Sequence, residues 1–268
     1  MNSVFEKVTT DFDYKLYQER QQYAISPENI ESQAQAFRCS DKFILDRETW
    51  DIIDYKGFAV VSMVQNNPSN DRLLNFLDSS REFLASKLNL PEAYYFLPRE
   101  SYHQTIANTL SDKRYLENIV NKGIEPVYHE FIKETFSSIA LPLLQQPLKM
   151  TMIGVNIFGS CIALLGIFNH MEDYNMISGF RQQFYQSDNL NKLDIKWTRP
   201  FVGHITLAYL GRNLELAEKK LLADTINELN AFVPNELIFN IAKAELRKYN
   251  DLSCFQRNPE FPVFHFSK

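Results

Sequence analysis

His103-Gln104-Thr105-Ile106-Ala107 and His204-Ile205-Thr206-Leu207-Ala208 are two copies of one five-residue pattern. Each copy reads His, any residue, Thr, a branched apolar residue and Ala. Both lie in stretches with the composition of strands, residues 101–110 and 201–210. Because side chains alternate faces along a strand, the His, Thr and Ala of each copy are expected on one face. The pattern therefore predicts two strands that each present an imidazole and a hydroxyl to an open space.

The opposite faces of the two strands are bulky and apolar. They carry Tyr102 and Ile106 in the first strand, and Ile205, Leu207 and Tyr209 in the second. These faces should pack on a core, because buried imidazoles and hydroxyls without partners would be costly there. Two such strands side by side would place two imidazoles and two hydroxyls around one small cleft.

Paired His-x-Thr strands, here with their histidines 101 residues apart (204 minus 103), resemble the 2H phosphoesterase superfamily. The segment Leu97-Pro98-Arg99-Glu100-Ser101-Tyr102-His103 is similar to the Leu-Pro-x-x-Ser-Tyr-His entry of a bacterial branch of uncharacterised members. The segment from Arg199 to Ala208 carries the usual apolar run around the second motif. The resemblance extends from about Tyr55 to the C-terminus.

This resemblance implies an α+β chain with a two-lobed 2H-phosphoesterase-like fold, in which antiparallel sheets flanked by helices surround a central cleft. Residues 1–45 would form an N-terminal extension, and residues 46–268 the two-lobed domain. The implied activity is that of a metal-independent phosphodiesterase on a cyclic or 2′-linked nucleotide or RNA-end phosphodiester, without a cofactor. The resemblance implies that His103, Thr105, His204 and Thr206 are the catalytic residues.

The residue types fit this chemistry. Hydrolysis of a phosphodiester needs a base to activate water and an acid to protonate the leaving oxygen, and imidazole can serve in either role near neutral pH. Threonine hydroxyls can donate to the phosphoryl oxygens, where the charge of the transition state resides. Arg99 and Arg199 precede the motif strands and are candidate phosphate contacts. Tyr102 and Tyr209 are out of phase with the cleft face, which favours the core or the rim, and complete the set of candidate substrate contacts.

Composition narrows the possible partners. The chain of 268 residues has 45% apolar residues, with 21 Phe and 13 Tyr, which supports a substantial core. Its formal net charge of −5 argues against a long nucleic-acid duplex as partner, because such proteins usually carry a basic stripe. No glycine-rich nucleotide loop is present. We therefore expect a small nucleotide or RNA-end phosphate as substrate, and a monomer.

Cysteine usage and hydropathy indicate the compartment. Cys39, Cys161 and Cys254 are odd in number and lack metal-ligand spacing, so we expect buried free thiols in a reducing cytoplasm and no metal site. The first residues show no apolar secretion signal. The longest apolar run, residues 150–168, is interrupted by polar residues and glycine, and is read as a buried hairpin rather than a membrane span.

Periodicity and capping signals predict the remaining elements. Ser26-Pro27 is typical of a helix start, with Ser as N-cap and Pro at the first helical position. Helices are expected over residues 13–23, 71–88, 112–122, 127–139, 172–186 and 213–230. Strands are expected over residues 57–65, 93–97, 148–157, 161–168, 237–246 and 263–266.

The sequence is compatible with three hypotheses about function. The chain is either an enzyme or a non-catalytic module of the same fold that binds nucleotides or RNA ends. In the third hypothesis, the chain is an unrelated α+β protein in which the motifs pack in the core. The sequence does not distinguish among cyclic mononucleotides, RNA-end cyclic phosphates, 2′-5′ oligonucleotides, cyclic dinucleotides and ADP-ribose cyclic phosphate. It also leaves open which histidine is the acid, and whether the reaction runs toward hydrolysis or ligation.

Overall fold

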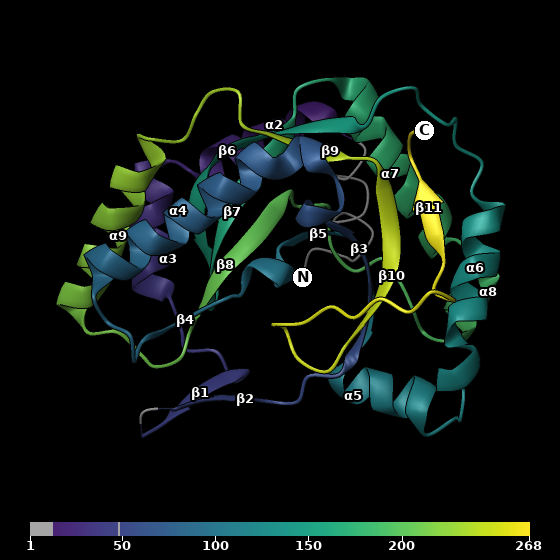
Figure 1. Cartoon of the computed structure of the whole chain (residues 1–268), viewed down its shortest axis with the longest axis horizontal. Coiled ribbons are helices and arrows are strands. Elements are labelled where there is room, and N and C mark those ends of the chain that lie inside the picture. The colour runs from purple at the N-terminus through teal and green to yellow at the C-terminus, as the bar shows by residue number, and fades with distance from the viewer. Residues whose placement is uncertain (1–12, 48) are drawn as a thin grey trace.

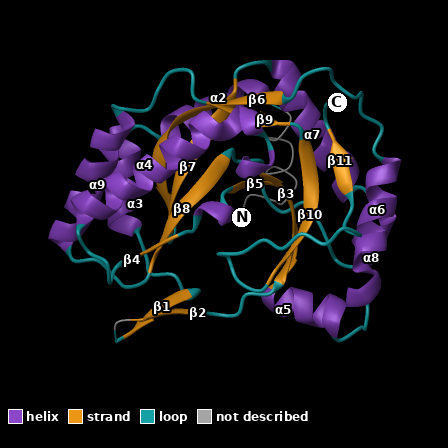
Figure 2. Cartoon of the chain, in the orientation of Figure 1, coloured by secondary structure: helices purple, strands orange, loops and turns teal. Residues whose placement is uncertain are grey.

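The computed structural model describes residues 13–47 and 49–268 (Figure 1). Its secondary structure is α+β, with helices covering two antiparallel sheets (Figure 2). The helices are α2 (Tyr14–Ala24), α3 (Pro27–Ala36), α4 (Asp71–Leu88), α5 (Asp112–Tyr115), α6 (Tyr128–Ser138), α7 (Met171–Tyr185), α8 (Asp188–Lys192) and α9 (Leu216–Asn230).

Each motif lies in a different sheet. The four-stranded sheet has the order β11-β10-β3-β5 and contains His103, and the five-stranded sheet has the order β4-β8-β7-β6-β9 and contains His204. The first sheet comprises β3 (Gly57–Met63), β5 (His103–Ser111), β10 (Lys243–Tyr249) and β11 (Val263–His265). The second comprises β4 (Tyr94–Phe96), β6 (Leu148–Phe158), β7 (Cys161–Phe168), β8 (His204–Leu210) and β9 (Ile238–Ile241).

Local signals account for several helix ends. The Ser26 hydroxyl accepts a hydrogen bond from the Asn29 amide at the start of α3, and Pro27 follows as expected. Helix α4 buries leucines on one face and ends at Asn89, whose φ of 45° is left-handed. Helix α9 starts with a capping box between Glu215 and Glu218. The sequence predicted the start of α3, and it predicted α4 and α9 to within a few residues.

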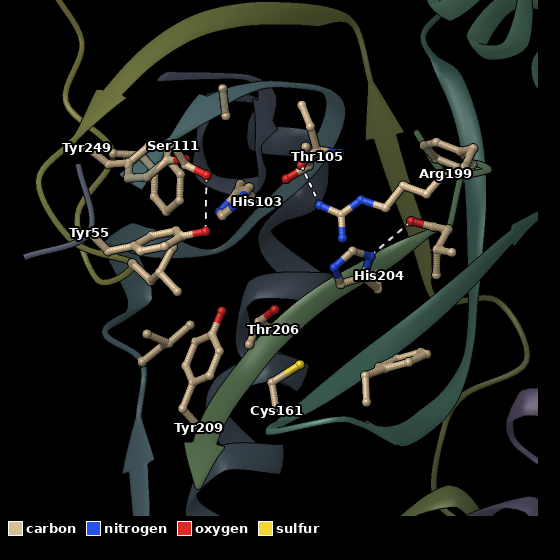
Figure 3. A pocket seen from close by; sticks show the side chains of 18 of the residues that line it. Tyr55, His103, Thr105, Ser111, Cys161, Arg199, His204, Thr206, Tyr209 and Tyr249 are labelled. Carbon is tan, nitrogen blue, oxygen red and sulfur yellow. Dashed lines mark hydrogen bonds between the residues drawn. The ribbon is translucent and has the colours of Figure 1, made fainter. Parts of the chain in front are cut away.

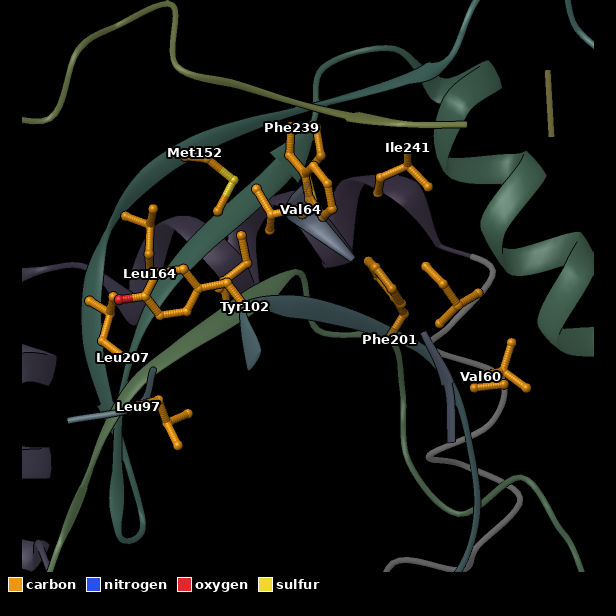
Figure 4. Packing of buried hydrophobic residues seen from close by; sticks show 14 of the residues in the cluster. Val60, Val64, Leu97, Tyr102, Met152, Leu164, Phe201, Leu207, Phe239 and Ile241 are labelled. Atoms are coloured by element: carbon orange, nitrogen blue, oxygen red, sulfur yellow. The ribbon is translucent and has the colours of Figure 1, made fainter. Parts of the chain in front are cut away.

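Helices cover the outer faces of the sheets. In the five-stranded sheet, α2 contacts β7, while α3 and α9 contact β6. Helix α6 contacts β11 of the other sheet, and α7 contacts both β5 and β7. The side chains between these layers form one large buried cluster, part of which Figure 4 shows around Tyr102, Leu164 and Leu207. Helix α7 therefore ties the two sheets together.

A β-bulge interrupts each motif strand at the same place. Thr105 pairs with Val61 but Ala107 pairs with the adjacent Val60, so β5 has one extra residue there. Strand β8 has its extra residue between Thr206 and Ala208, which pair with Ala163 and Ile162. A bulge shifts the alternation of side chains by one position.

Because of this shift, some motif residues lie on the opposite strand face from the one predicted. Ala107 and Ala208, predicted on the cleft face, are fully buried in the core. Tyr209, predicted to share a face with Ile205 and Leu207, points to the other side, as the next subsection describes. A strict alternation cannot anticipate this, because the bulge depends on the register of the neighbouring strand.

Two other expectations need correction. Residues 237–246, predicted as one strand, form β9 and β10, which belong to different sheets. Leu237, Phe239 and Ile241 are buried at every second position, and the next buried residue is Ala244, so the period breaks at Ala242. The hairpin of β1 (Phe43–Asp46) and β2 (Thr49–Ile52) was not predicted from the sequence.

No helix in the part of the chain that the structure describes is both long and apolar enough to cross a membrane.

Candidate active site

One cavity of about 440 Å³ is lined by residues from both sheets. Six of the eight predicted site residues line it, namely His103, Thr105, Arg199, His204, Thr206 and Tyr209. Figure 3 shows the four motif side chains around a common space, with the guanidinium of Arg199 between Thr105 and His204. The structure thus brings the two motifs together although each belongs to a separate sheet.

Arg99 and Tyr102 do not reach this cavity. Arg99 forms an ion pair with Asp78 of α4. Tyr102 is fully buried in the core, where Figure 4 shows its ring among Val64, Leu164 and Leu207. The structure therefore corrects the predicted substrate contacts at these two positions, because the residues that precede β5 face away from the cleft.

Both histidines are held in the same way. The Nδ1 atom of His103 lies 2.7 Å from the carbonyl oxygen of Ser101, and that of His204 lies 2.9 Å from the carbonyl oxygen of Val202. A carbonyl oxygen only accepts, so Nδ1 carries the proton in each case and donates it. Nε2 is left as the nitrogen available to a ligand, and it is an acceptor when the ring is neutral.

Burial makes both imidazoles harder to protonate. The pKa of His103 is lowered to about 4, mainly by desolvation. The hydrogen bond to Ser101 opposes this decrease, and the nearby His204 and Arg247 add to it. Desolvation also lowers the pKa of His204, with a smaller contribution in the same direction from Arg199. Both rings are therefore neutral at pH 7 when the cavity holds no anion.

The charge of the cavity favours an anion. Its formally charged lining residues in the described part of the chain are Arg181 and Arg199, and none is an Asp or Glu. One guanidinium nitrogen of Arg199 donates to Asn108 Oδ1 at 2.9 Å. The second motif hydroxyl, that of Thr206, lies within hydrogen-bonding reach of the Cys161 thiol and the Tyr209 hydroxyl (Figure 3). These groups together supply positive charge and neutral donors but no negative charge.

Gln104, the variable residue of the first motif, joins the two motif strands. Its side-chain oxygen accepts a hydrogen bond from the His204 amide at 2.6 Å, and its nitrogen donates to the Val202 carbonyl at 3.1 Å. The same nitrogen donates to the carbonyl of Thr105 at 2.8 Å. Gln104 is fully buried, so this link has little competition from water.

The N-terminal helix α2 supports the entry to β8. Arg20 donates to the Phe201 carbonyl at 2.7 Å, and Gln21 donates to the Gly203 carbonyl at 3.1 Å. Gly203 lies so close to β7 that a Cβ there would stand 2.5 Å from the Gly166 oxygen. Helix α2, which lies in the predicted N-terminal extension, thus positions the backbone on both sides of Val202, whose carbonyl binds His204.

Several residues that line the cavity or support it were not predicted from the sequence. Asn108 and Ser111 of β5 reach the cavity because of two bulges in that strand. Tyr55 and Tyr249 come from segments far from the motifs. Of these residues, only Gln104 could have been noticed in the sequence. It is a polar amide beside His103, on the strand face that otherwise carries apolar residues.

The cysteines differ from expectation. All three are free thiols, but Cys39 and Cys254 are exposed, and Cys161 lies beside Thr206 in the cavity. Burial raises the pKa of the Cys161 thiol to about 12, so it is neutral at pH 7. No group of three or more His, Cys, Asp or Glu side chains with metal-binding geometry occurs within residues 13–47 and 49–268.

No protein-family model and no curated protein matches this chain. Among solved structures, the chain is similar to a conserved protein of unknown function from Agrobacterium tumefaciens. The TM-score is 0.54 at 16% identity, over 82% of this chain and 90% of that chain. A protein from Thermus thermophilus is 12% identical over 78% of this chain and 97% of that chain, with a TM-score of 0.43. The Agrobacterium protein shows that the fold is shared, whereas the Thermus protein is too distant to support an inference.

Proposed function

We propose that this protein is a metal-independent phosphodiesterase of the 2H type, which acts on a cyclic or 2′-linked nucleotide or RNA-end phosphodiester. The observation that carries the proposal is the convergence of His103 and His204 from two sheets on one cavity, each with Nδ1 bonded to the carbonyl oxygen two residues earlier. The two antiparallel sheets, each with one motif strand, support the two-lobed arrangement typical of that superfamily.

The phosphate is expected between the two histidines. Arg199 supplies the positive charge, and the hydroxyls of Thr105 and Thr206 donate to the non-bridging oxygens. Because no carboxylate lines the described part of the cavity, nothing there repels an anion. A neutral or cationic ligand gains less from these groups, which favours a phosphodiester.

The reaction divides between the two rings. One neutral Nε2 takes a proton from water as the water oxygen forms a bond to phosphorus. The other ring, protonated at Nε2, gives its proton to the leaving oxygen as the phosphorus–oxygen bond breaks. Each ring then holds the proton state that the other had at the start, and exchange with solvent restores the enzyme. Each acid or base role is worth about 10²–10⁴-fold in rate.

Because the pKa of both histidines is low, either ring is neutral and can act as a base in the free protein. A ring can act as an acid only after the substrate binds and raises its pKa. An anion within a few ångströms favours the charged form of an imidazole and raises its pKa. The incoming phosphodiester therefore promotes protonation of one ring, while the other stays neutral because two adjacent imidazolium ions repel each other. Activity should show a bell-shaped dependence on pH, with a histidine on each limb.

The test is a panel of 2′,3′-cyclic mononucleotides, RNA-end cyclic phosphates and 2′-5′ dinucleotides, assayed with EDTA present throughout. We expect turnover of at least one compound, with a bell-shaped pH profile and loss of activity in H103A and H204A. Complete loss in EDTA would contradict the metal-independent mechanism. Binding of a panel compound without turnover would instead identify a nucleotide-binding module.

A further inference from the structure

The side of the cavity away from Arg199 carries a cluster of hydroxyls. The Tyr55 hydroxyl lies 3.1 Å from that of Ser111, and the Tyr249 hydroxyl is also within hydrogen-bonding reach of Ser111. In Figure 3, these three side chains lie on one side of His103 and Arg199 lies on the other. Polar groups that line a cavity are those that orient a ligand within it.

The surface beside these hydroxyls is apolar. Tyr249 and Phe255 belong to a small hydrophobic cluster, separate from the main core, against which Tyr55 and Leu252 pack. All four residues line the cavity. The ring of Phe255 stands 4.0 Å from that of His103, measured between centroids. An organic group that extends from a phosphate at His103 would therefore meet aromatic faces with hydroxyls at their edges.

Backbone irregularities bring these groups together. A second bulge in β5 lies between Asn108, which pairs with Ala59, and Ser111, which pairs with Gly57. It directs Ser111 to the cavity. A Cβ at Gly57 would stand 2.9 Å from the Tyr249 hydroxyl and 2.5 Å from the Leu110 carbonyl oxygen. Only a glycine at position 57 allows the Tyr249 hydroxyl to approach the β3–β5 pair this closely.

This part of the cavity is uncharged. Desolvation raises the pKa of Tyr249, which keeps its hydroxyl protonated at pH 7. The only Arg or Lys residues in the described cavity lining are Arg181 and Arg199. The guanidinium of Arg181 donates to the backbone carbonyls of Ile106 and Arg199. The Nζ atom of Lys42 lies 4.4 Å from the centre of the Tyr55 ring, but Lys42 is paired with Asp41 and does not line the cavity. A second phosphate placed beside the hydroxyls would therefore find no cation among the described lining residues.

The cavity is larger than a single phosphate group. About 440 Å³ lies within the range of roughly 300–1,000 Å³ that is usual for sites of whole small molecules. One phosphate group between the histidines would fill only part of it. The remainder of the ligand must then suit a surface that is aromatic, hydroxylated and neutral.

We infer that Tyr55, Ser111 and Tyr249 form a second subsite, which binds the uncharged organic group esterified to the phosphate. The inference rests on the proposed function for the position of the phosphate. It names a ligand class with one phosphate anion and a neutral, hydrogen-bonding remainder, such as the sugar and base of a single nucleoside. Ligands with a further phosphate in the remainder fall outside this class.

Calorimetry with three probes tests the subsite without any turnover. The probes are inorganic phosphate, adenosine 2′-monophosphate and adenosine 2′,5′-bisphosphate. The variants are Tyr249→Phe and Ser111→Ala, which each delete one hydroxyl. Tyr102→Phe is the matched control, because it removes a buried tyrosine hydroxyl that has no hydrogen-bond partner and does not line the cavity.

We expect each subsite variant to weaken the monophosphate by about two- to ten-fold, the effect of one neutral hydrogen bond, and to leave inorganic phosphate unchanged. The bisphosphate should bind wild-type protein no more tightly than the monophosphate does. Tyr102→Phe should match wild type with all three probes. Thermal unfolding of each variant verifies that it is folded.

Three results would overturn the inference. They are unchanged monophosphate affinity in both folded subsite variants, equal weakening of both phosphate and monophosphate, and a gain of ten-fold or more for the bisphosphate. The proposed function is judged separately by turnover. Subsite effects without turnover would leave the subsite standing and reject the hydrolase, whereas turnover with insensitive binding would do the reverse.

Discussion

Strand β5 lies at the edge of the four-stranded sheet, whereas β8 lies between β4 and β7 in the five-stranded sheet. The outer edge of β5 is completed by side chains of α7. Arg181 donates to the Ile106 carbonyl at 2.9 Å, and the Tyr185 hydroxyl accepts from the Asn108 amide at 2.9 Å and donates to its carbonyl at 3.1 Å. A helix thus supplies the hydrogen bonds that a further strand would make.

Strand β8 is supported on both edges by backbone pairing, and its entry is held by α2 and by Gln104. The motif geometry itself is nevertheless the same in both strands, with a bulge after the threonine and Nδ1 bound to the carbonyl two residues earlier. The two motif strands therefore share one local geometry, although different parts of the chain stabilise each of them. Loss of either histidine should therefore lower the catalytic rate to a similar extent, although different residues hold the two strands in place.

The largest expected effect tests the equality of the two histidines. H103A and H204A should each lower kcat/KM by about 10²–10⁴-fold, because each removes one acid or base role. The measurement is steady-state hydrolysis of the best substrate of the panel, with H129A as a control outside the cavity. A variant that retains full activity while its counterpart loses it would show that only one sheet carries the chemistry.

Substitution of the motif threonines should have a smaller effect on kcat/KM than loss of a histidine, and it tests both strands in the same way. Thr105→Val and Thr206→Val keep the shape of a β-branched residue and delete one donor to the phosphate. Each should lose about ten- to a hundred-fold in kcat/KM, from roughly 1.5–3 kcal/mol for a hydrogen bond to a charged group, with the pH profile unchanged. Unfolding of a valine variant would identify that threonine as structural. A folded variant with wild-type kinetics would show that its hydroxyl does not contact the phosphate.

Gln104 offers a way to disturb one histidine and not the other. Gln104→Met preserves the volume but leaves the His204 amide without its buried acceptor, which should lower the free energy of unfolding by about 1–3 kcal/mol. NMR should show shifted imidazole signals for His204 and unchanged signals for His103. Urea denaturation gives the stability change. Equal perturbation of both histidines would indicate that the two sheets respond as one unit.

The smallest effect is on the pH dependence of stability. The pKa of His103 is about 4 in the folded protein and near the ordinary 6.5 when unfolded, so the unfolded state binds more protons between these values. The free energy of unfolding should therefore fall as pH decreases from 6.5 to 4, by on the order of 1 kcal/mol from this partly exposed residue. Denaturation of wild type and His103→Gln across this window measures it. An unchanged pH slope in the variant would place the pKa of His103 near its ordinary value, and the same pair of measurements on His204 compares the two sites.

Local sequence patterns predicted much of the fold. The leucines of α4, the Ser26-Pro27 cap of α3 and the hairpin of β6 and β7 all appear where periodicity and turn signals indicated. The two motif strands were also predicted, and their shared pattern suggested one site. These features depend on residues close together in the chain, so the sequence alone contains enough information for them.

Tertiary structure decided which side chains share the cavity. The bulges that bury Ala107 and Ala208 and expose Tyr209 to the cleft depend on the register of β3 and β7. The break at Ala242, where the chain passes from one sheet to the other, depends on which strands are available to pair. Tyr55 and Tyr249 acquire their positions from contacts with Ser111, which lies far from both in the chain, and no local pattern records these contacts. Local propensity acts within a few residues, whereas the cavity is formed by packing between segments a hundred or more residues apart.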